Sequence, residues 1–194
     1  VSGVCLIDTC MNTVEIIPDL ICVPGYSHLP EVAAVMAAKA ASINGLFRAK
    51  ALIDADCGPN GVRKCADLGD YKTENHLVDE NQIRCCTMVH KNGHQFHIST
   101  HLAGLMAQVD TSNAGVPYES PSNKRFQIDG CCLEDGTEIN LTFEESNFIA
   151  SHGIVTALNF MTMGWTCRNN YTACYPENTD VKDYFIPVSR MFDW

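Results

Sequence analysis

The sequence is short of basic residues, and those it has are dispersed. Its 194 residues include 13 Lys and Arg against 23 Asp and Glu, giving a formal net charge of -10, and no basic run is longer than Lys124-Arg125. A protein that binds phosphate backbones regardless of sequence needs Lys and Arg concentrated on one face. We therefore expect no nucleic-acid partner.

Long apolar runs and a recognisable start are also missing. No apolar stretch approaches the roughly 20 residues that span a bilayer, and no signal peptide opens the chain, so we expect no membrane partner. The chain begins at Val1 without Met and ends on the bulky stretch Arg190–Trp194. Such side chains need a partner to pack against. We therefore expect residues 1–194 to be a single globular fragment of a longer subunit, with any sub-boundary near 134–152.

Glycine-rich phosphate loops and local catalytic signatures are absent as well. Pro24–Ser27 lies where a helix amino terminus binds anions, but one glycine is too few for a dinucleotide fingerprint, and we interpret it as a tight turn. Asp54 and Asp56 suit either a metal at a strand end or a capped turn. The sequons at Asn140 and Asn170 carry little meaning without a secretory signal.

Cysteine, in contrast, is abundant and odd in number, with eleven residues. In a secreted protein this would suggest disulfides with one thiol left over. Five of them lie in apolar, strand-like runs, where a free thiol behaves as a small hydrophobe: Cys22, Cys85, Cys86, Cys131 and Cys132. We therefore expect reduced thiols and assembly in a cytosol. Four others are candidates for an exposed, reactive thiol but lack any local signature: Cys57, Cys65, Cys167 and Cys174.

Four histidines lie close together in the sequence and suggest a metal site: His90, His94, His97 and His101. Zinc requires ligands that converge tetrahedrally, and the last two have the i, i+4 spacing of a helical pair. A glycine turn and an expected helix cap at Ser99 or Thr100 interrupt the stretch, and no Glu follows His97. We expect ordinary surface or capping histidines, with no metal, no cofactor and no catalytic residue.

The pattern of apolar runs predicts an α/β fold with α+β character, a mixed sheet with flanking helices. Near the amino terminus, strand, helix and strand at this spacing indicate a βαβ unit with a parallel pair. Near the carboxyl terminus, two apolar runs around a glycine turn indicate a β-hairpin. The expected strands are Asp19–Val23, Ala49–Ala55, Gln82–His90, Phe126–Leu133, Ile154–Phe160 and Trp165–Tyr171, with Gln95–Ile98 pairing back. The expected helices are Val4–Val14, Glu31–Ile43 with Pro30 in its first turn, His101–Asp110, Phe143–His152 capped by Thr142, and the opening turns of one at Val181–Trp194.

Taken in order, several segments resemble one protein family. They are Ile17–His28 with the following helix and the strand Arg48–Asp54, Ser99–Asp110 with Gly115–Asn123, Asn147–Thr156, and Gly164–Thr172. The first is similar to a strand–Pro-Gly–helix–strand block, the second to an Ala-Gly-Leu helix and Pro-Ser-Asn loop, and the last to a Trp-Gly-Asn-Arg-Thr turn. The family that all four segments resemble is that of the tail sheath subunits of contractile phage tails. Residues 56–97 match the family poorly.

The resemblance implies a structural subunit of a phage or prophage tail, without catalytic activity. Sheath subunits assemble helically around a tail tube and contract to drive it through the host envelope. The implied partners are other sheath subunits and the tube protein, and the implied location is the virion, after assembly in the bacterial host cytoplasm. The loop Thr111–Lys124 and residues 56–80 become the expected lattice surfaces. The expected sub-boundary near 134–152 would precede the family's conserved carboxyl-terminal domain.

The fragment alone is expected to be monomeric or weakly associating, because each lattice contact depends on many repeated copies. Two alternatives remain open: a cytosolic α/β enzyme with a Cys/His site, and a zinc-binding interaction module. A stoichiometric zinc ion, or one thiol with a strongly depressed pKa, would favour them.

Overall fold

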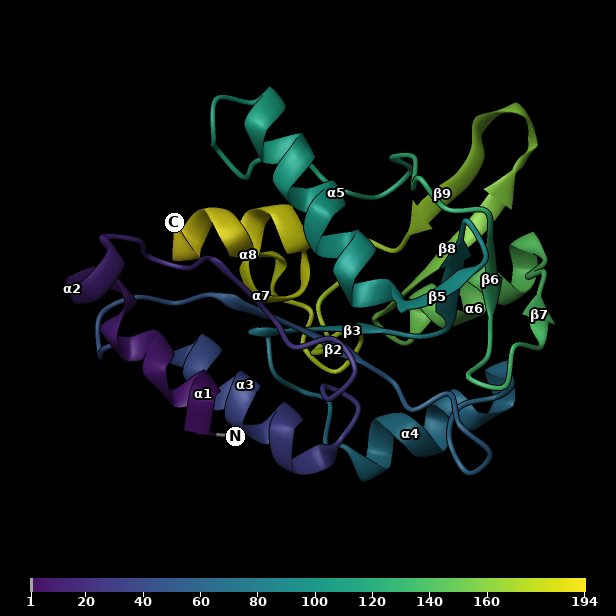
Figure 1. The fold of residues 1–194 in the computed structure, drawn as a ribbon, viewed down its shortest axis with the longest axis horizontal. Helices are drawn as coiled ribbons and strands as arrows, with labels where there is room; N and C mark the ends of the chain where they lie inside the picture. The colour runs from purple at the N-terminus through teal and green to yellow at the C-terminus, as the bar shows by residue number, and fades with distance from the viewer. Residues whose placement is uncertain (1) are drawn as a thin grey trace.

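A computed structural model describes residues 2–194 and shows an α/β fold with two sheets (Figure 1). The mixed sheet has the order β1 (Leu20–Cys22), β2 (Lys50–Asp54), β3 (Gln82–Cys85), β8 (Ile154–Phe160) and β9 (Gly164–Arg168). Its first four strands are parallel, and β9 is antiparallel to β8. The antiparallel sheet has the order β5 (His94–His97), β4 (Met88–Lys91), β6 (Gly130–Cys132) and β7 (Glu138–Ile139).

Helices cover both faces of the mixed sheet (Figure 1). The longer ones are α3 (Pro30–Ala41), α4 (Leu68–Glu74), α5 (Ile98–Ser112), α6 (Phe143–Ser151) and α8 (Ile186–Asp193). The shorter ones are α1 (Ser2–Cys5), α2 (Cys10–Val14), α7 (Val181–Tyr184) and the 3-10 turns η1 (Leu6–Thr9), η2 (Cys65–Asp67) and η3 (Met161–Met163). Among the described residues no helix is long and apolar enough to cross a membrane.

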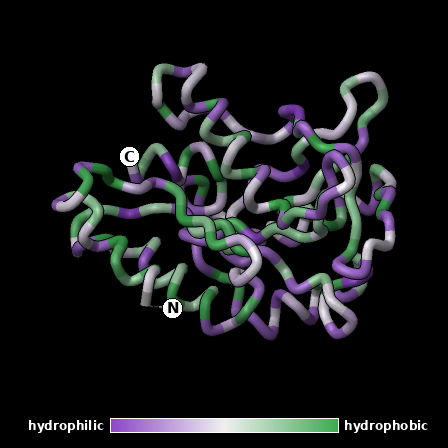
Figure 2. The backbone as a smooth tube through the Cα atoms, in the orientation of Figure 1, coloured by the Kyte–Doolittle hydropathy of each residue, from purple (hydrophilic) through white to green (hydrophobic). Residues whose placement is uncertain are grey.

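Strand β2 lies at the centre of the core, and every one of its residues is buried. Because side chains alternate along a strand, Leu52 packs on the α5 face while Ala51 and Ile53 pack on the α3 face. A parallel strand buried on both faces has a continuous apolar run, which Figure 2 shows as hydrophobic backbone in the middle of the molecule. Val89 of β4 brings the second sheet into the same core.

The predicted βαβ unit is confirmed: β1 and β2 pair in parallel, and α3 connects them with Pro30 in its first turn. The predicted carboxyl-terminal hairpin is also present, although β9 ends at Arg168 rather than Tyr171. Helix α6 begins after Thr142 as expected.

The prediction of one strand at Gln82–His90 was wrong, because two strands of different sheets occupy this stretch. Thr87 between them has a φ of 75°, a left-handed conformation that a β-branched residue rarely adopts. There the chain leaves the parallel sheet for the antiparallel one. Cys85 and Cys86, just before this break, pack into different core clusters.

Helix α5 begins at Ile98, three residues before the predicted start, and Ser99 lies inside its first turn. The backbone N–H and the hydroxyl of Ser99 donate to the Asp54 carboxylate, at 3.0 and 2.6 Å. A side chain at the end of β2 therefore satisfies the helix amino terminus, whose free N–H groups need acceptors.

Two other predicted elements are shorter than expected. Of Phe126–Leu133, only Gly130–Cys132 forms a strand. The helix expected over Val181–Trp194 is two short helices, because Phe185 is extended and forms a β-bridge with Tyr171. A bridging residue cannot also continue the helical hydrogen bonding.

The capping box of α6 gives a stability prediction. The Thr142 hydroxyl accepts from the Glu145 N–H at 3.2 Å, and the Glu145 carboxylate accepts from the Thr142 N–H at 2.8 Å. Replacing Thr142 with Ala should lower the free energy of unfolding by about 1 kcal/mol. Urea denaturation measures this change in the free energy of unfolding. Thr162→Ala, the same substitution at an exposed threonine, is the matched control. Equal stability of the two variants would contradict the capping role.

Candidate functional site

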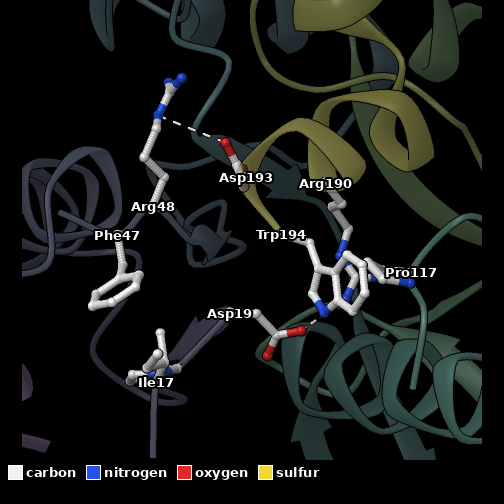
Figure 3. A pocket seen from close by; sticks show the side chains of 9 residues that line it. Ile17, Asp19, Phe47, Arg48, Pro117, Arg190, Asp193 and Trp194 are labelled. Carbon is white, nitrogen blue, oxygen red and sulfur yellow. Dashed lines mark hydrogen bonds and ion pairs between the residues drawn. The ribbon is translucent and has the colours of Figure 1, made fainter. Parts of the chain in front are cut away.

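A pocket of about 380 Å³ lies where the end of the chain meets the segment before β1 and the turn before β2 (Figure 3). Its apolar lining comes from four separate segments: Ile17, Pro18, Phe47, Pro117 and Trp194. Charged side chains form the rest of the wall: Asp19, Arg48, Arg190 and Asp193. We call this the α8 pocket.

The helix beside this pocket has an unusual distribution of side chains. Ser189 and Arg190 are buried beside the apolar Ile186, whereas Phe192 and Trp194, which follows the helix, are 72% and 70% exposed. A surface helix ordinarily turns its apolar side to the core and its polar side to water. Phe192, Met191 and Tyr118 also line a second hollow of about 390 Å³. Exposed apolar patches of this kind mark interaction surfaces.

A buried ion pair holds α8 in this orientation. Arg190 is 3% exposed, and its guanidinium donates to both oxygens of Asp110 on α5, at 3.0 and 2.6 Å. A third bond, of 3.1 Å, reaches Asp19 just before β1. Bidentate pairing of this kind fixes both distance and orientation.

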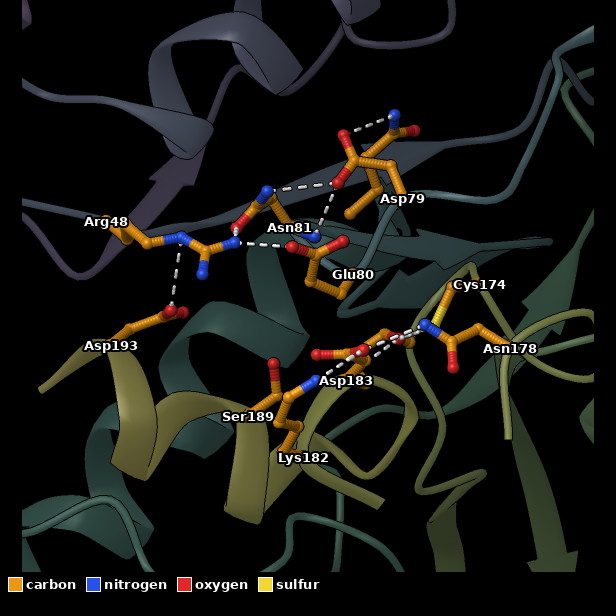
Figure 4. Close-up of polar contacts among 12 residues, drawn as sticks. Arg48, Asp79, Glu80, Asn81, Cys174, Asn178, Lys182, Asp183, Ser189 and Asp193 are labelled. Atoms are coloured by element: carbon orange, nitrogen blue, oxygen red, sulfur yellow. Dashed lines mark hydrogen bonds and ion pairs between the residues drawn. The ribbon is translucent and has the colours of Figure 1, made fainter. Parts of the chain in front are cut away.

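A second set of polar contacts joins α8 to β2 and to the residues just before β2 and β3, and Figure 4 shows those made by Arg48. The buried Lys50 ammonium, on β2, donates to the Ser189 hydroxyl at 2.6 Å and lies 2.7 Å from the Asp193 carboxylate. Burial lowers the pKa of Lys50, and Asp193 opposes that shift. The Arg48 guanidinium lies between two carboxylates, 3.6 Å from that of Asp193 and 2.5 Å from that of Glu80. These charged side chains pair with one another and attach α8 to the rest of the molecule.

The four histidines of the predicted cluster are distributed over β4, β5 and α5. His90 and His94 lie opposite Gln95 and Lys91 in the antiparallel ladder. His97 stacks on His28, with ring centroids 5.9 Å apart. His101 contacts Phe96 edge-on, and burial lowers its pKa. Within residues 2–194, no group of three or more His, Cys, Asp or Glu side chains could hold a metal ion.

The two aspartates that suited either a metal or a turn serve as hydrogen-bond acceptors. Asp54 is 2% exposed and accepts from the hydroxyls of Ser27 and Ser99, at 2.7 and 2.6 Å. Asp56 accepts from the N–H of Gly58 at 2.8 Å, which closes a turn. The geometry supports the turn interpretation for Asp56, whereas Asp54 accepts from residues distant in the sequence and caps the amino terminus of α5.

The tight turn predicted at Pro24–Ser27 has its N–H groups occupied. Tyr26 and Ser27 both donate to the Val23 carbonyl, at 3.2 and 3.0 Å. These two donors are therefore used within the turn itself.

Three of the four cysteines expected to be exposed are buried, which corrects that prediction: Cys57, Cys167 and Cys174. Cys65 is half-buried. Burial raises the pKa of Cys57 and Cys167 to about 12 each. Thr166 and Arg168 flank Cys167, but its position in β9, opposite Ala157 of β8, turns the thiol into the core. Cys22, expected to be buried, is half-buried, and the most exposed thiol is that of Cys5.

Sequence reasoning missed the α8 pocket, although two of its signals were visible. The bulky end Arg190–Trp194 suggested a missing partner, and the loop Thr111–Lys124 was expected to be a contact surface. That loop supplies Pro117 to the pocket and Tyr118 to the second hollow. The buried pairing of Arg190 with Asp110, 80 residues apart, has no local signature.

No protein-family model matches the chain, and no curated protein is significantly similar to it. Solved structures share its fold. The sheath complex of an extracellular contractile injection system (PVC) in the contracted state is 17% identical, with a TM-score of 0.70 over 98% of this chain and 48% of that one. The contracted helical sheath of the anti-feeding prophage (AFP) is 18% identical, with a TM-score of 0.64 over 96% and 47%.

The AFP baseplate contains a chain with the same degree of similarity. It is 18% identical, with a TM-score of 0.64 over 96% of this chain and 46% of that one. The present chain thus spans about half the length of the solved chains it matches. At these identities the similarity shows a shared fold, that of contractile sheath proteins.

Thiol labelling tests the assignment of buried cysteines. Burial raises the pKa of nine of the eleven thiols, and thiolates are the reactive form. With a chromogenic disulfide reagent near pH 7.5, the seven buried thiols should react only after denaturation: Cys57, Cys85, Cys86, Cys131, Cys132, Cys167 and Cys174. One of these seven reacting in the native protein faster than Cys5 would contradict this and favour a Cys/His site.

The buried ion pair of α8 gives a second prediction. Arg190→Met leaves Asp110 buried without its partner, which should cost about 3–5 kcal/mol of unfolding free energy. The double variant with Asp110→Leu should recover part of that loss, because no uncompensated charge remains. Denaturant titration measures both, with Arg63→Met in the solvent-exposed Arg63–Asp135 pair as a nearly neutral control. If Arg190→Met behaves like that control, the pair does not anchor the helix.

Proposed function

We propose that this chain is part of a structural subunit of a contractile tail sheath, which assembles helically around a tube and shortens to drive it through an envelope. The observation that carries the proposal is the shared fold, with a TM-score of 0.70 over 98% of the chain, to a sheath complex in the contracted state. A second sheath, in the AFP particle, supports it independently.

The use of polar groups agrees with a structural role. The charged side chains around the α8 pocket pair with one another and attach a helix, and burial raises the pKa of most thiols. The residues described favour neither a Cys/His enzyme nor a zinc-binding module over the sheath subunit. In a sheath the work of contraction comes from exchanging contacts between subunits rather than from a reaction.

The partners and the location follow from the proposal. The chain's partners would be further copies of itself and a tube protein, and its location a phage or phage-like particle assembled in a bacterial cytoplasm. We also propose that residues 1–194 form one globular unit, with any sub-boundary near 134–152. The parallel pairing of β3 with β8, across that stretch, supports a single unit.

Electron microscopy of the complete gene product tests the proposal. Co-expressed with a candidate tube protein from a contractile tail system, the product should form tubes whose outer layer binds antibodies raised against residues 1–194 along its whole length. The tube-type protein alone, giving narrower and unlabelled tubes, is the control. A gene product that stays monomeric and labels no tubular particle in either case would refute the sheath assignment.

A further inference from the structure

The tip of the β8–β9 hairpin is a second exposed apolar feature, far from the α8 pocket. The hairpin projects at one end of the molecule's long axis, and α8 lies toward the other (Figure 1). Its tip is the 3-10 turn η3, where Met161 is 84% and Met163 46% exposed. Two methionines at the end of a protruding hairpin expose flexible, polarizable side chains that adapt to irregular hollows.

The backbone of the tip is strained as well as exposed. Met161 has a φ of 46°, in the left-handed region where a residue with a side chain is disfavoured. Such outliers are found where a binding function maintains them.

A free positive charge lies beside these methionines. The Arg125 guanidinium rests against Gly164, the first residue after η3, where an added Cβ would come within 3.6 Å of its Nε. Arg125 is exposed and forms no ion pair with any residue of 2–194. The hairpin tip therefore combines exposed methionine with an uncompensated cation.

The α8 pocket offers the complementary groups. Phe47 and Trp194 stand on its wall, and methionine sulfur makes favourable contacts with aromatic rings. The Asp19 side chain at the same pocket is 60% exposed and has one bond, to Arg190. Its outer side can accept a cation, and a volume of about 380 Å³ has room for a methionine side chain.

We propose that the hairpin tip of one copy docks into the α8 pocket of the next copy, with Met161 against Phe47 and Trp194 and Arg125 facing Asp19. This inference rests on the proposed sheath function, because it names the surfaces by which copies would meet. The two surfaces differ and lie toward opposite ends of the molecule. The contact is therefore heterologous, and repeating it builds a ring or, where the rotation between copies does not close, an open helical array, rather than a two-fold dimer.

The size of the contact fits an array better than a stable pair. A tip of a few residues buries on the order of a few hundred Å², well below the roughly 1,000 Å² that a specific stable interface requires. Two isolated copies would therefore associate weakly. Many such contacts along a lattice add up through multivalency.

Site-specific photocrosslinking tests the contact directly. A benzophenone amino acid replaces Met161 in the 194-residue chain, and a concentrated mixture of ¹⁵N-labelled and unlabelled copies is irradiated. Mass spectrometry should find peptides joined between copies, with the probe attached to those containing Phe47 or Trp194. The same probe at Tyr26, which is exposed and belongs to neither surface, should not reach these peptides.

Charge reversal tests the second half of the contact. With the probe at residue 161, Arg125→Glu should lower the yield of these crosslinks by roughly fivefold or more, since it places like charges together. Lys64→Glu, a charge reversal at an exposed lysine that belongs to neither surface, should leave the yield within about twofold, because this charge faces no partner in the proposed contact. Circular dichroism checks that both variants fold. Equal yields for both, or crosslinks that do not favour the α8 pocket, would overturn the inference.

Imaging separates this inference from the function on which it rests. In the complete gene product, Met161→Asp should abolish or shorten the tubes that the unmodified product forms. Normal tubes from this variant would refute the hairpin contact and leave the sheath function intact. If the unmodified product forms no tubes, the sheath function fails whatever the crosslinks show.

Discussion

Strand β2 is buried along its whole length, and a charged residue stands at each of its ends. Lys50 opens the strand and Asp54 closes it, with 0% and 2% exposure. A buried charge is tolerated only when it is paired and hydrogen-bonded. Much of the architecture around the sheet supplies those partners, from segments far apart in the sequence.

Each end of β2 assembles a different part of the molecule. At the carboxyl end, Asp54 joins the turn after β1, through Ser27, to the amino terminus of α5, through Ser99. At the amino end, Lys50 fixes α8 through Ser189 and Asp193. The first arrangement builds the core. The second buries Ser189 and Arg190 of α8 together with the apolar Ile186, and leaves Met191 and Phe192 at its end facing out.

The exposed apolar end of α8 connects the fold to the proposed assembly. A helix held by ion pairs can expose aromatic side chains at a defined position without losing its attachment. A subunit of a lattice needs such surfaces, because its work depends on contacts between copies. In the contact that we propose, the other surface is the strained, methionine-tipped hairpin toward the other end of the molecule. The eleven cysteines need no separate role, since most of them simply fill the core.

The sequence alone determined those features whose causes are local. Pro30 and the apolar spacing placed α3, the Thr142–Glu145 capping box placed α6, and the glycine turn placed the hairpin. The order of segments also indicated the sheath-type fold that the solved structures share. In each case a short stretch of chain carries enough information, because its hydrogen bonds close within a few residues.

Only the tertiary structure decided the rest. The break at Thr87 arises because the residues before it pair in one sheet and the residues after it pair in the other. The start of α5 depends on Asp54, 45 residues away, and the orientation of α8 on Asp110, 80 residues away. Whether a cysteine such as Cys167 is buried depends on which side of its strand faces the core. When a residue's partner is brought close only by folding, the sequence around that residue contains no pattern that predicts the contact.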